Sequence, residues 1–165
     1  MNNYEIEELY NKYYKDLYIY AFSICKNYHI TEEVVSETFL RAFITIDNAK
    51  CNVKFWLLYV CKNIIIDYYR KNKRMSYLDI EEKDIRVEDN TLEKFIKDEE
   101  KREVFKSILK LSEVYREVII KFYYMNLTTK EIAKSLQVSE GAVRSILYRG
   151  RQKIGKLLRK GKYEF

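Results

Sequence analysis

The sequence predicts an all-α protein of two small helical domains joined by an acidic linker, the second containing a helix-turn-helix. Three observations support this. The 165 residues include no proline and only four glycines, all after residue 140, whereas βα folds use both residues at their turns. Apolar residues recur at steps of three and four, the spacing of a helix face. Formal charge is −5 over residues 79–103 and +7 over 128–165, within a total of +6.

We therefore expect one helical domain over residues 1–76, the linker over 77–103 and a second domain over 104–165. An apolar stripe between Ile6 and Cys25 predicts a long first helix. Thr31, followed by Glu32 and Glu33, predicts the N-cap of a second helix that ends near Asp47. A loop over 47–52 then leads to a third helix, which is apolar on nearly all sides over 55–66 and becomes basic toward Arg74.

The second domain carries the clearest local signals. Apolar residues from Val104 to Phe122 predict two short helices. Thr128 and Glu131 have the spacing of a capping box. A helix-turn-helix follows. Ala133 is the small residue where the two helices cross, and Gln137 stands at a turn position often held by glycine. Val138 and Val143 are expected to fill the angle between the helices. A left-handed backbone at such a glutamine costs about 1 kcal/mol.

The second helix of this motif predicts DNA binding. Ser139 can cap it, and its outward face then presents polar and basic residues that suit the major groove: Glu140, Gly141, Arg144, Ser145, Tyr148 and Arg149. Arg144 and Arg149 could read guanine or hold phosphate, and the basic residues that follow add sequence-independent attraction. A solvated basic helix pair is the alternative interpretation. The agreement of cap, turn and apolar spacing favours DNA binding.

Other functional classes lack their sequence signals. Glu5, Glu7 and Glu8 stand where a secretory signal would be basic, and the most apolar stretch is too short to span a bilayer, so we expect a cytoplasmic protein. The single histidine, His29, and the three cysteines, Cys25, Cys51 and Cys61, predict neither a metal site nor a disulfide framework, and we interpret them as structural. No catalytic motif is present, so we expect no enzyme activity and no cofactor.

Taken together, these segments resemble the sigma-70 family of bacterial RNA polymerase initiation factors, in its extracytoplasmic-function (ECF) group. Residues 111–149 are similar to region 4 of that family, 31–43 to region 2.2, and 55–71 to regions 2.3 and 2.4. The resemblance implies a sigma factor that binds the clamp and flap of core RNA polymerase, recognises promoter DNA and directs transcription initiation. It also implies an anti-sigma partner, often membrane-anchored, and no small-molecule substrate.

The resemblance also implies site residues. For the minus-35 element they are Ser139, Glu140, Arg144, Ser145, Tyr148 and Arg149; for the minus-10 element Asn63, Asp67, Arg70 and Lys71; and for core polymerase Glu32, Glu33, Glu37 and Phe39. Two positions depart from the family pattern, with Ser36 in place of a glutamine and Ile30 in place of an acid. We expect Glu33 and Glu37 to be solvated and to lack a partner within the chain.

Several alternatives stay open at this point. Trp56, Tyr59 and Tyr68 could stack on unpaired bases, although an aromatic residue at helical spacing more often packs in a core. Asn63 and Asp67 could contact DNA or satisfy backbone groups. The linker could be a solvated tether or could follow the RNA path of the polymerase. Rival functions are a free-standing helix-turn-helix regulator that binds an operator as a dimer, and a recombinase or nuclease with a helix-turn-helix tail.

Overall fold

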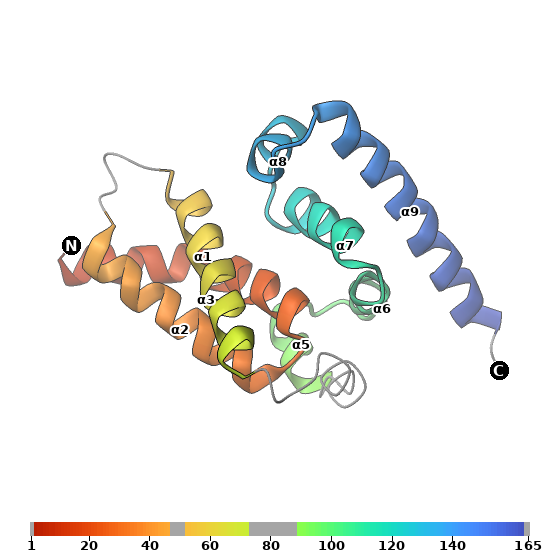
Figure 1. The fold of residues 1–165 in the computed structure, drawn as a ribbon. Helices are drawn as coiled ribbons and strands as arrows, with labels where there is room; N and C mark the ends of the chain where they lie inside the picture. Colours follow the sequence, from red (N-terminus) through yellow and green to blue (C-terminus); the bar gives the residue numbers. More distant parts are fainter. Residues whose placement is uncertain (1, 47–51, 73–88, 164–165) are drawn as a thin grey trace. The chain divides into compact units, whose positions relative to one another are not determined.

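The computed structural model describes residues 2–46, 52–72 and 89–163. Within these ranges every regular element is a helix, which confirms the all-α prediction (Figure 1). The chain divides into two compact units, Met1–Val87 and Glu88–Phe165. Of the predicted segments, loop residues 47–51, linker residues 77–88 and the positions of Lys73 and Arg74 lie outside the described ranges.

Unit 1 is a three-helix assembly of α1 (Asn3–Cys25), α2 (Tyr28–Thr45) and α3 (Val53–Lys71). Each helix packs against the other two. Their apolar stripes meet in one core, in which the buried residues include Leu17, Tyr18, Phe22, Val34, Val35, Phe39, Leu57, Cys61 and Ile65. The long first helix and the apolar third helix are therefore confirmed, and the second helix ends at Thr45, close to its predicted end.

The start of α2 corrects the predicted cap. Asn27 is the N-cap, and its Oδ1 accepts the Ile30 N–H at 2.9 Å directly after Lys26 has ended α1 in the left-handed conformation. Thr31 lies inside the helix and is fully buried, with its hydroxyl donating to the Asn27 carbonyl at 2.7 Å. A threonine can satisfy its hydroxyl in this way within a helix. The helix consequently begins one turn before the position that Thr31 indicated.

Unit 2 contains α5 (Asp89–Phe95), α6 (Glu99–Leu109), α7 (Glu113–Ile119), the π-helical turn η1 (Ile120–Tyr124), α8 (Thr129–Leu136) and α9 (Glu140–Tyr163). Part of the segment expected to be linker is thus helical. Asp98 caps α6 by accepting the Lys101 N–H at 3.2 Å, and Glu99 and Glu100 lie in the first turn. Acids there are stabilised by the helix dipole, so the negative charge that suggested a tether instead favours the start of a helix.

A buried ion pair connects η1 with its neighbours. The Nζ of Lys121 lies 3.2 Å from Oε1 of Glu117 on α7, and both side chains are at least nine-tenths buried. The same Nζ donates to Ser135 Oγ on α8 at 3.3 Å. A buried charge requires such partners, because desolvation of an unpaired ion is costly. The hydrogen bond from Lys121 to Ser135 therefore ties α8, the first helix of the helix-turn-helix, to the segment that precedes it.

The helix-turn-helix is formed by α8 and α9, and its predicted caps are confirmed. Thr128 Oγ1 accepts the Glu131 N–H at 3.1 Å, and Glu131 Oε1 accepts the Thr128 N–H at 3.3 Å. Ser139 Oγ accepts the Ala142 N–H at 3.1 Å. Gln137 does adopt the left-handed conformation, with φ of 58°.

One packing expectation for this motif is wrong. Val143 is fully buried and fills the angle between the two helices, but the Val138 side chain is 43% exposed. The Val138 backbone N–H closes the turn on the Ala133 carbonyl at 3.1 Å, and the turn at Gln137 leaves its side chain at the surface. Val143 alone therefore packs between the two helices, where both valines were expected to pack.

The contact between α7 and α9 depends on a glycine. A Cβ placed on Gly150 would lie 2.5 Å from Cδ1 of Ile119, which is itself fully buried. No real Cβ is tolerated at that distance without movement of the isoleucine, and cores accept such movement poorly. Gly150 therefore allows the two helices to approach closely.

Gly150→Val should lower the free energy of unfolding of unit 2 by about 1–3 kcal/mol, because it overpacks the site beside Ile119. Gly161→Val is the matched control, since a Cβ at Gly161 meets no atom within 4 Å. Urea unfolding followed by circular dichroism measures both variants, and fluorescence of the single tryptophan, Trp56, reports unit 1 separately. Equal stability of the two variants would contradict the close packing of α7 and α9.

Candidate functional site

The first candidate surface is the outward face of α9. Val143 and Leu147 point into the core of unit 2, which leaves Gly141, Arg144, Ser145, Tyr148 and Arg149 exposed. Tyr148 is 62% exposed although it is a large aromatic residue. The structure therefore brings the predicted minus-35 residues together on the first turns of one helix.

Two of the predicted minus-35 residues already have hydrogen-bond partners within the chain. Ser139 is the N-cap of α9, so its hydroxyl is already engaged with a backbone amide. Glu140 Oε1 accepts a hydrogen bond from Thr129 Oγ1 at 3.0 Å and lies 3.3 Å from Nη2 of Arg144. Glu140 thus joins the two helices of the motif and orients Arg144, whose side chain is 65% exposed.

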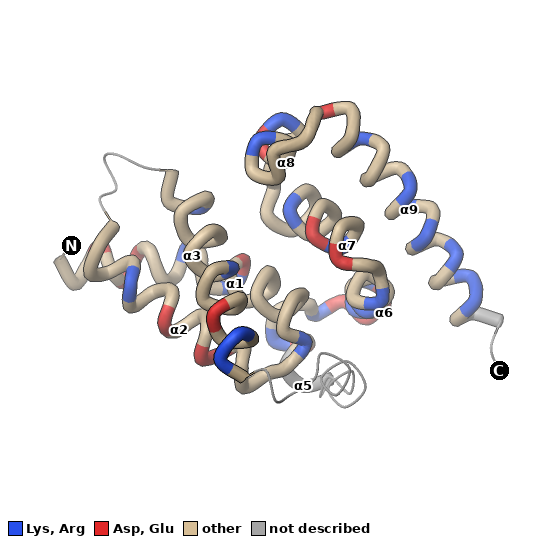
Figure 2. The backbone as a smooth tube through the Cα atoms, viewed as in Figure 1, with Lys and Arg blue, Asp and Glu red and all other residues tan. Residues whose placement is uncertain are grey.

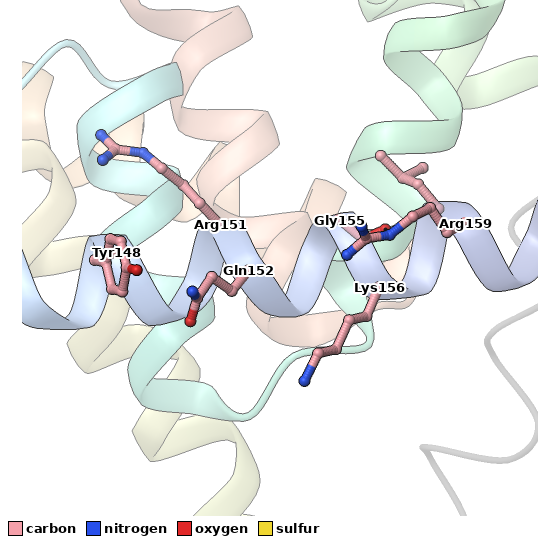
Figure 3. Close-up of a pocket in the computed structure, with 7 residues that line it drawn as sticks. Tyr148, Arg151, Gln152, Gly155, Lys156 and Arg159 are labelled. Carbon is pink, nitrogen blue, oxygen red and sulfur yellow. The ribbon is translucent and has the colours of Figure 1, made fainter.

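Positive charge continues along α9 beyond this face. Figure 2 shows Lys and Arg following one another along the helix, with acid at its first turn. A shallow hollow lies on its outer surface, lined by Tyr148, Arg151, Gln152, Gly155, Lys156, Leu158 and Arg159 (Figure 3). Its lining combines three cations with an amide, an aromatic ring, a leucine and a glycine, and the cations suit an anionic polymer.

A second surface lies on α3. Tyr59, Asn63, Ile66 and Arg70 are separated by three or four residues and share one side of the helix. Asn63 is half-buried, whereas Asp67, Arg70 and Lys71 are exposed, so all four predicted minus-10 residues lie on the last three turns of α3. Tyr59 is 70% exposed, so the expectation that it is a core residue is wrong, whereas Trp56 and Tyr68 are half-buried.

The third surface lies on α2 and corrects two expectations. Phe39 is only 2% exposed and packs in the core, with its ring centroid 5.0 Å from that of Tyr10. It cannot offer its ring to a partner. Glu37 is not without an internal partner, because its Oε1 accepts a hydrogen bond from Arg41 Nη2 one turn later. Glu33 and Glu37 are exposed, as predicted, and Glu32 is exposed too.

The α2 surface also contains residues that sequence reasoning missed. Leu40 is 58% exposed and Ile44 is 75% exposed, and both share the side of the helix that carries Glu33 and Glu37. Leu40 and Ile44 follow Glu33 by seven and eleven residues, which places them on this side of the helix. That spacing could have identified them as surface residues from the sequence. Their exposure was not expected from the sequence, because apolar residues of a helix are usually taken to face the core. The surface therefore combines two acids, an arginine and two apolar side chains.

Other chemistries have little support in the described ranges. No group of three or more His, Cys, Asp or Glu that could hold a metal ion occurs there. Burial raises the pKa of the Cys25 thiol to about 12 and also raises the pKa of the Cys61 thiol, so neither forms the reactive thiolate at neutral pH. His29 lies at the surface with its ring against Tyr28, and Cys51 lies outside the described residues. No described helix is long and apolar enough to cross a membrane.

Comparison with known proteins covers both units. Residues 9–75 match the family model described as Sigma-70 region 2, and residues 101–154 match that described as Sigma-70, region 4. The chain is 32% identical over 168 residues to the ECF RNA polymerase sigma factor SigM of Bacillus subtilis, covering 94% of this chain and 96% of that protein. It is 33% identical over 159 residues to SigW of the same organism, covering 88% of this chain and 85% of that protein.

A solved structure has the same fold. The sigma factor RpoE from Bartonella quintana, crystallised in complex with the anti-sigma factor NepR, superimposes with a TM-score of 0.67 at 19% identity over 94% of this chain and 97% of that one. The order of the two matched regions and the full-length similarity to SigM agree with this fold. The chain therefore belongs to the ECF group of the sigma-70 family.

Proposed function

We propose that this protein is a promoter-specificity subunit, which binds core RNA polymerase and directs it to promoters through two DNA-binding units. The observation that carries the proposal is the pairing, in one chain, of a sigma-70 region 2 unit with a region 4 helix-turn-helix whose exposed face is basic. On this proposal α9 reads the minus-35 duplex, α3 opens the minus-10 element and α2 docks on the polymerase clamp. A catalytic role of its own is not required.

The remaining partners follow from the same proposal. Unit 2 contacts the polymerase flap, and an anti-sigma factor binds the protein and holds it inactive. Binding of this kind occurs in RpoE, which was solved in complex with the anti-sigma factor NepR. The protein acts in the cytoplasm, where polymerase and promoter DNA meet. Run-off transcription with core polymerase on genomic fragments tests the proposal as a whole. Binding of a palindromic operator as a dimer, without polymerase, would support the rival regulator instead.

The minus-35 assignment predicts different effects for two cations of α9. Arg144 is oriented by Glu140, so it can offer two donors to a guanine edge. Arg144→Ala should cost about 1–3 kcal/mol of binding free energy and relax preference at one base pair. Lys156→Ala should weaken binding to all sequences alike. Binding isotherms over a panel of duplexes measure both variants, and uniform losses for both would make Arg144 a phosphate contact only.

The minus-10 assignment predicts that the exposed side of α3 is needed for strand opening. Stacking of an unpaired base on an aromatic side chain contributes about 1–3 kcal/mol, and Tyr59 is exposed enough to offer its ring. Tyr59→Ala, Asn63→Ala and Arg70→Ala should reduce permanganate reactivity of minus-10 thymines while polymerase assembly and minus-35 binding stay intact.

Tyr4→Ala is the matched control for this series, because Tyr4 is also an exposed tyrosine of unit 1 but lies on α1. It should leave the footprint unchanged. If the α3 variants open the promoter as well as the control does, then Asn63 only satisfies local groups and Tyr59 has no stacking role.

The polymerase assignment predicts that charge reversal on α2 prevents assembly. Glu33→Lys with Glu37→Lys replaces attraction to a basic partner with repulsion, which costs several kcal/mol at an interface. Loss of the exposed Glu37–Arg41 pair costs about 1 kcal/mol at most, so the variant should stay folded. Co-purification with core polymerase measures assembly, and circular dichroism checks helicity.

The matched control for this variant is Glu7→Lys with Glu8→Lys, which reverses two exposed acids of α1. It changes net charge equally and should assemble normally. Leu40→Ala with Ile44→Ala should weaken assembly as well, because these exposed apolar side chains share the side of α2 that carries the acids. Normal assembly of both α2 variants would mean that polymerase docks elsewhere.

A further inference from the structure

Arg151 of α9 is held in place by two aromatic residues of η1. Its Nε donates a hydrogen bond to the Tyr123 hydroxyl at 2.5 Å. Its guanidinium carbon lies 5.5 Å from the Tyr123 ring centroid and 5.9 Å from that of Phe122. The two rings are nearly perpendicular, with centroids 5.0 Å apart, so they form a corner against which the guanidinium rests.

The π-helical geometry of η1 accompanies this corner. The Met125 N–H bonds the Ile120 carbonyl five residues earlier, at 3.1 Å, which widens the turn that carries Phe122 and Tyr123. Single π turns inside helices are frequent at functional sites. Tyr123 is half exposed, so this corner contributes little to the core of unit 2. Its geometry is better explained by its contact with the Arg151 guanidinium.

The contacts leave most of the guanidinium available. Among the described residues, Nη1 and Nη2 of Arg151 make no hydrogen bond or ion pair, although Arg41 and Arg144 each pair with a glutamate. An arginine whose rotamer is already fixed loses less conformational entropy when it binds an anion. Arg151 is therefore an ordered cation with free donors, a state that suits a phosphate oxygen.

The position of Arg151 identifies the anion. Arg144, Tyr148 and Arg151 follow at steps of four and three, so they share one side of α9. Seven residues of helix span about 10 Å, close to the width of about 12 Å of the major groove. When Arg144 faces a base edge, Arg151 lies near the sugar–phosphate backbone that borders the groove. Figure 3 shows the side chains of Arg151 and Lys156 extending in different directions from the two edges of the hollow on α9.

We propose that Arg151 is a preorganised contact to a DNA phosphate and that Tyr123, which itself touches no DNA, is the positioning residue that holds it. This inference rests on the proposed function of α9 as the reader of duplex DNA. It assigns a role to η1, a segment before the helix-turn-helix, in the affinity of that motif. The contact is to phosphate and carries no base preference.

The first experiment tests the phosphate contact. Binding of the full chain to short duplex DNA of mixed sequence is measured by fluorescence anisotropy over a series of salt concentrations. Arg151→Gln should reduce the slope of log K against log salt by about 0.9, the value for one lost phosphate. Lys153→Gln is the matched control. Lys153 also rests on an aromatic ring, that of Tyr115, but it lies on the side of α9 opposite Arg144. It should change the slope less than Arg151→Gln does.

The second experiment tests the positioning role. Tyr123→Phe removes the hydroxyl and keeps the ring, and it should weaken duplex binding roughly two- to tenfold, the cost of ordering one side chain. It should have no effect in the Arg151→Gln background, because the two residues act through one contact. Tyr115→Phe, which removes a hydroxyl from the control pair, should bind as the wild type does.

Each contrary result has a distinct meaning. If Tyr123→Phe lowers the unfolding midpoint but not DNA affinity, the contact only braces η1 against α9 and the inference is overturned. The same holds if Arg151→Gln leaves the salt slope unchanged while Arg144→Ala still relaxes base preference, a result that keeps the proposed function. If the wild-type chain, alone or assembled with polymerase, binds no duplex, the proposed function and this inference fail together.

Discussion

The arrangement of unit 2 depends on the close approach of α7 to α9 at Ile119 and Gly150. One side of α9 must be buried and another must be exposed. The rotation of the helix about its own axis decides which residues are buried and which are exposed. Because Gly150 has no side chain, Ile119 can lie against the α9 backbone. That contact, together with buried Val143 and Leu147, directs Arg144 and Tyr148 outward. A rotation of α9 by one residue position, about 100°, would replace this face with another.

The same division of helix sides explains unit 1. On α2, Val35 and Phe39 enter the core, and Leu40 and Ile44 are left at the surface beside the acids. Apolar residues with no core to join are informative, because exposed apolar patches commonly mark sites of protein association. On α3, Tyr59 is likewise left exposed, on the side that we propose faces nucleic acid. Both surfaces therefore follow from apolar residues that the three-helix core cannot accommodate.

Most short-range patterns were predicted correctly from the sequence, with the cap of α2 as the exception, whereas the exposure of side chains was not. The capping box of Thr128 and Glu131 and the left-handed Gln137 depend on neighbouring residues only, and both were predicted. Thr31 was misread because Asn27, four residues earlier, competes for the same role. Tyr59 was expected in the core because a helical stripe gives the side of a helix but not whether another helix covers it, whereas Phe39 was assigned to the polymerase contact by the family resemblance.

The sequence by itself determined the all-α fold and its family, and it predicted where each proposed interface lies, because helical periodicity, caps and charge are properties of contiguous segments. Only the tertiary structure decided which side chains are free to bind. Exposure depends on how helices from distant segments pack. The packing leaves Leu40 exposed and buries its neighbour Phe39. It also brought Tyr123 to Arg151 across 28 residues of chain. No local pattern encodes that contact, because it exists only once α7 and η1 have packed on α9.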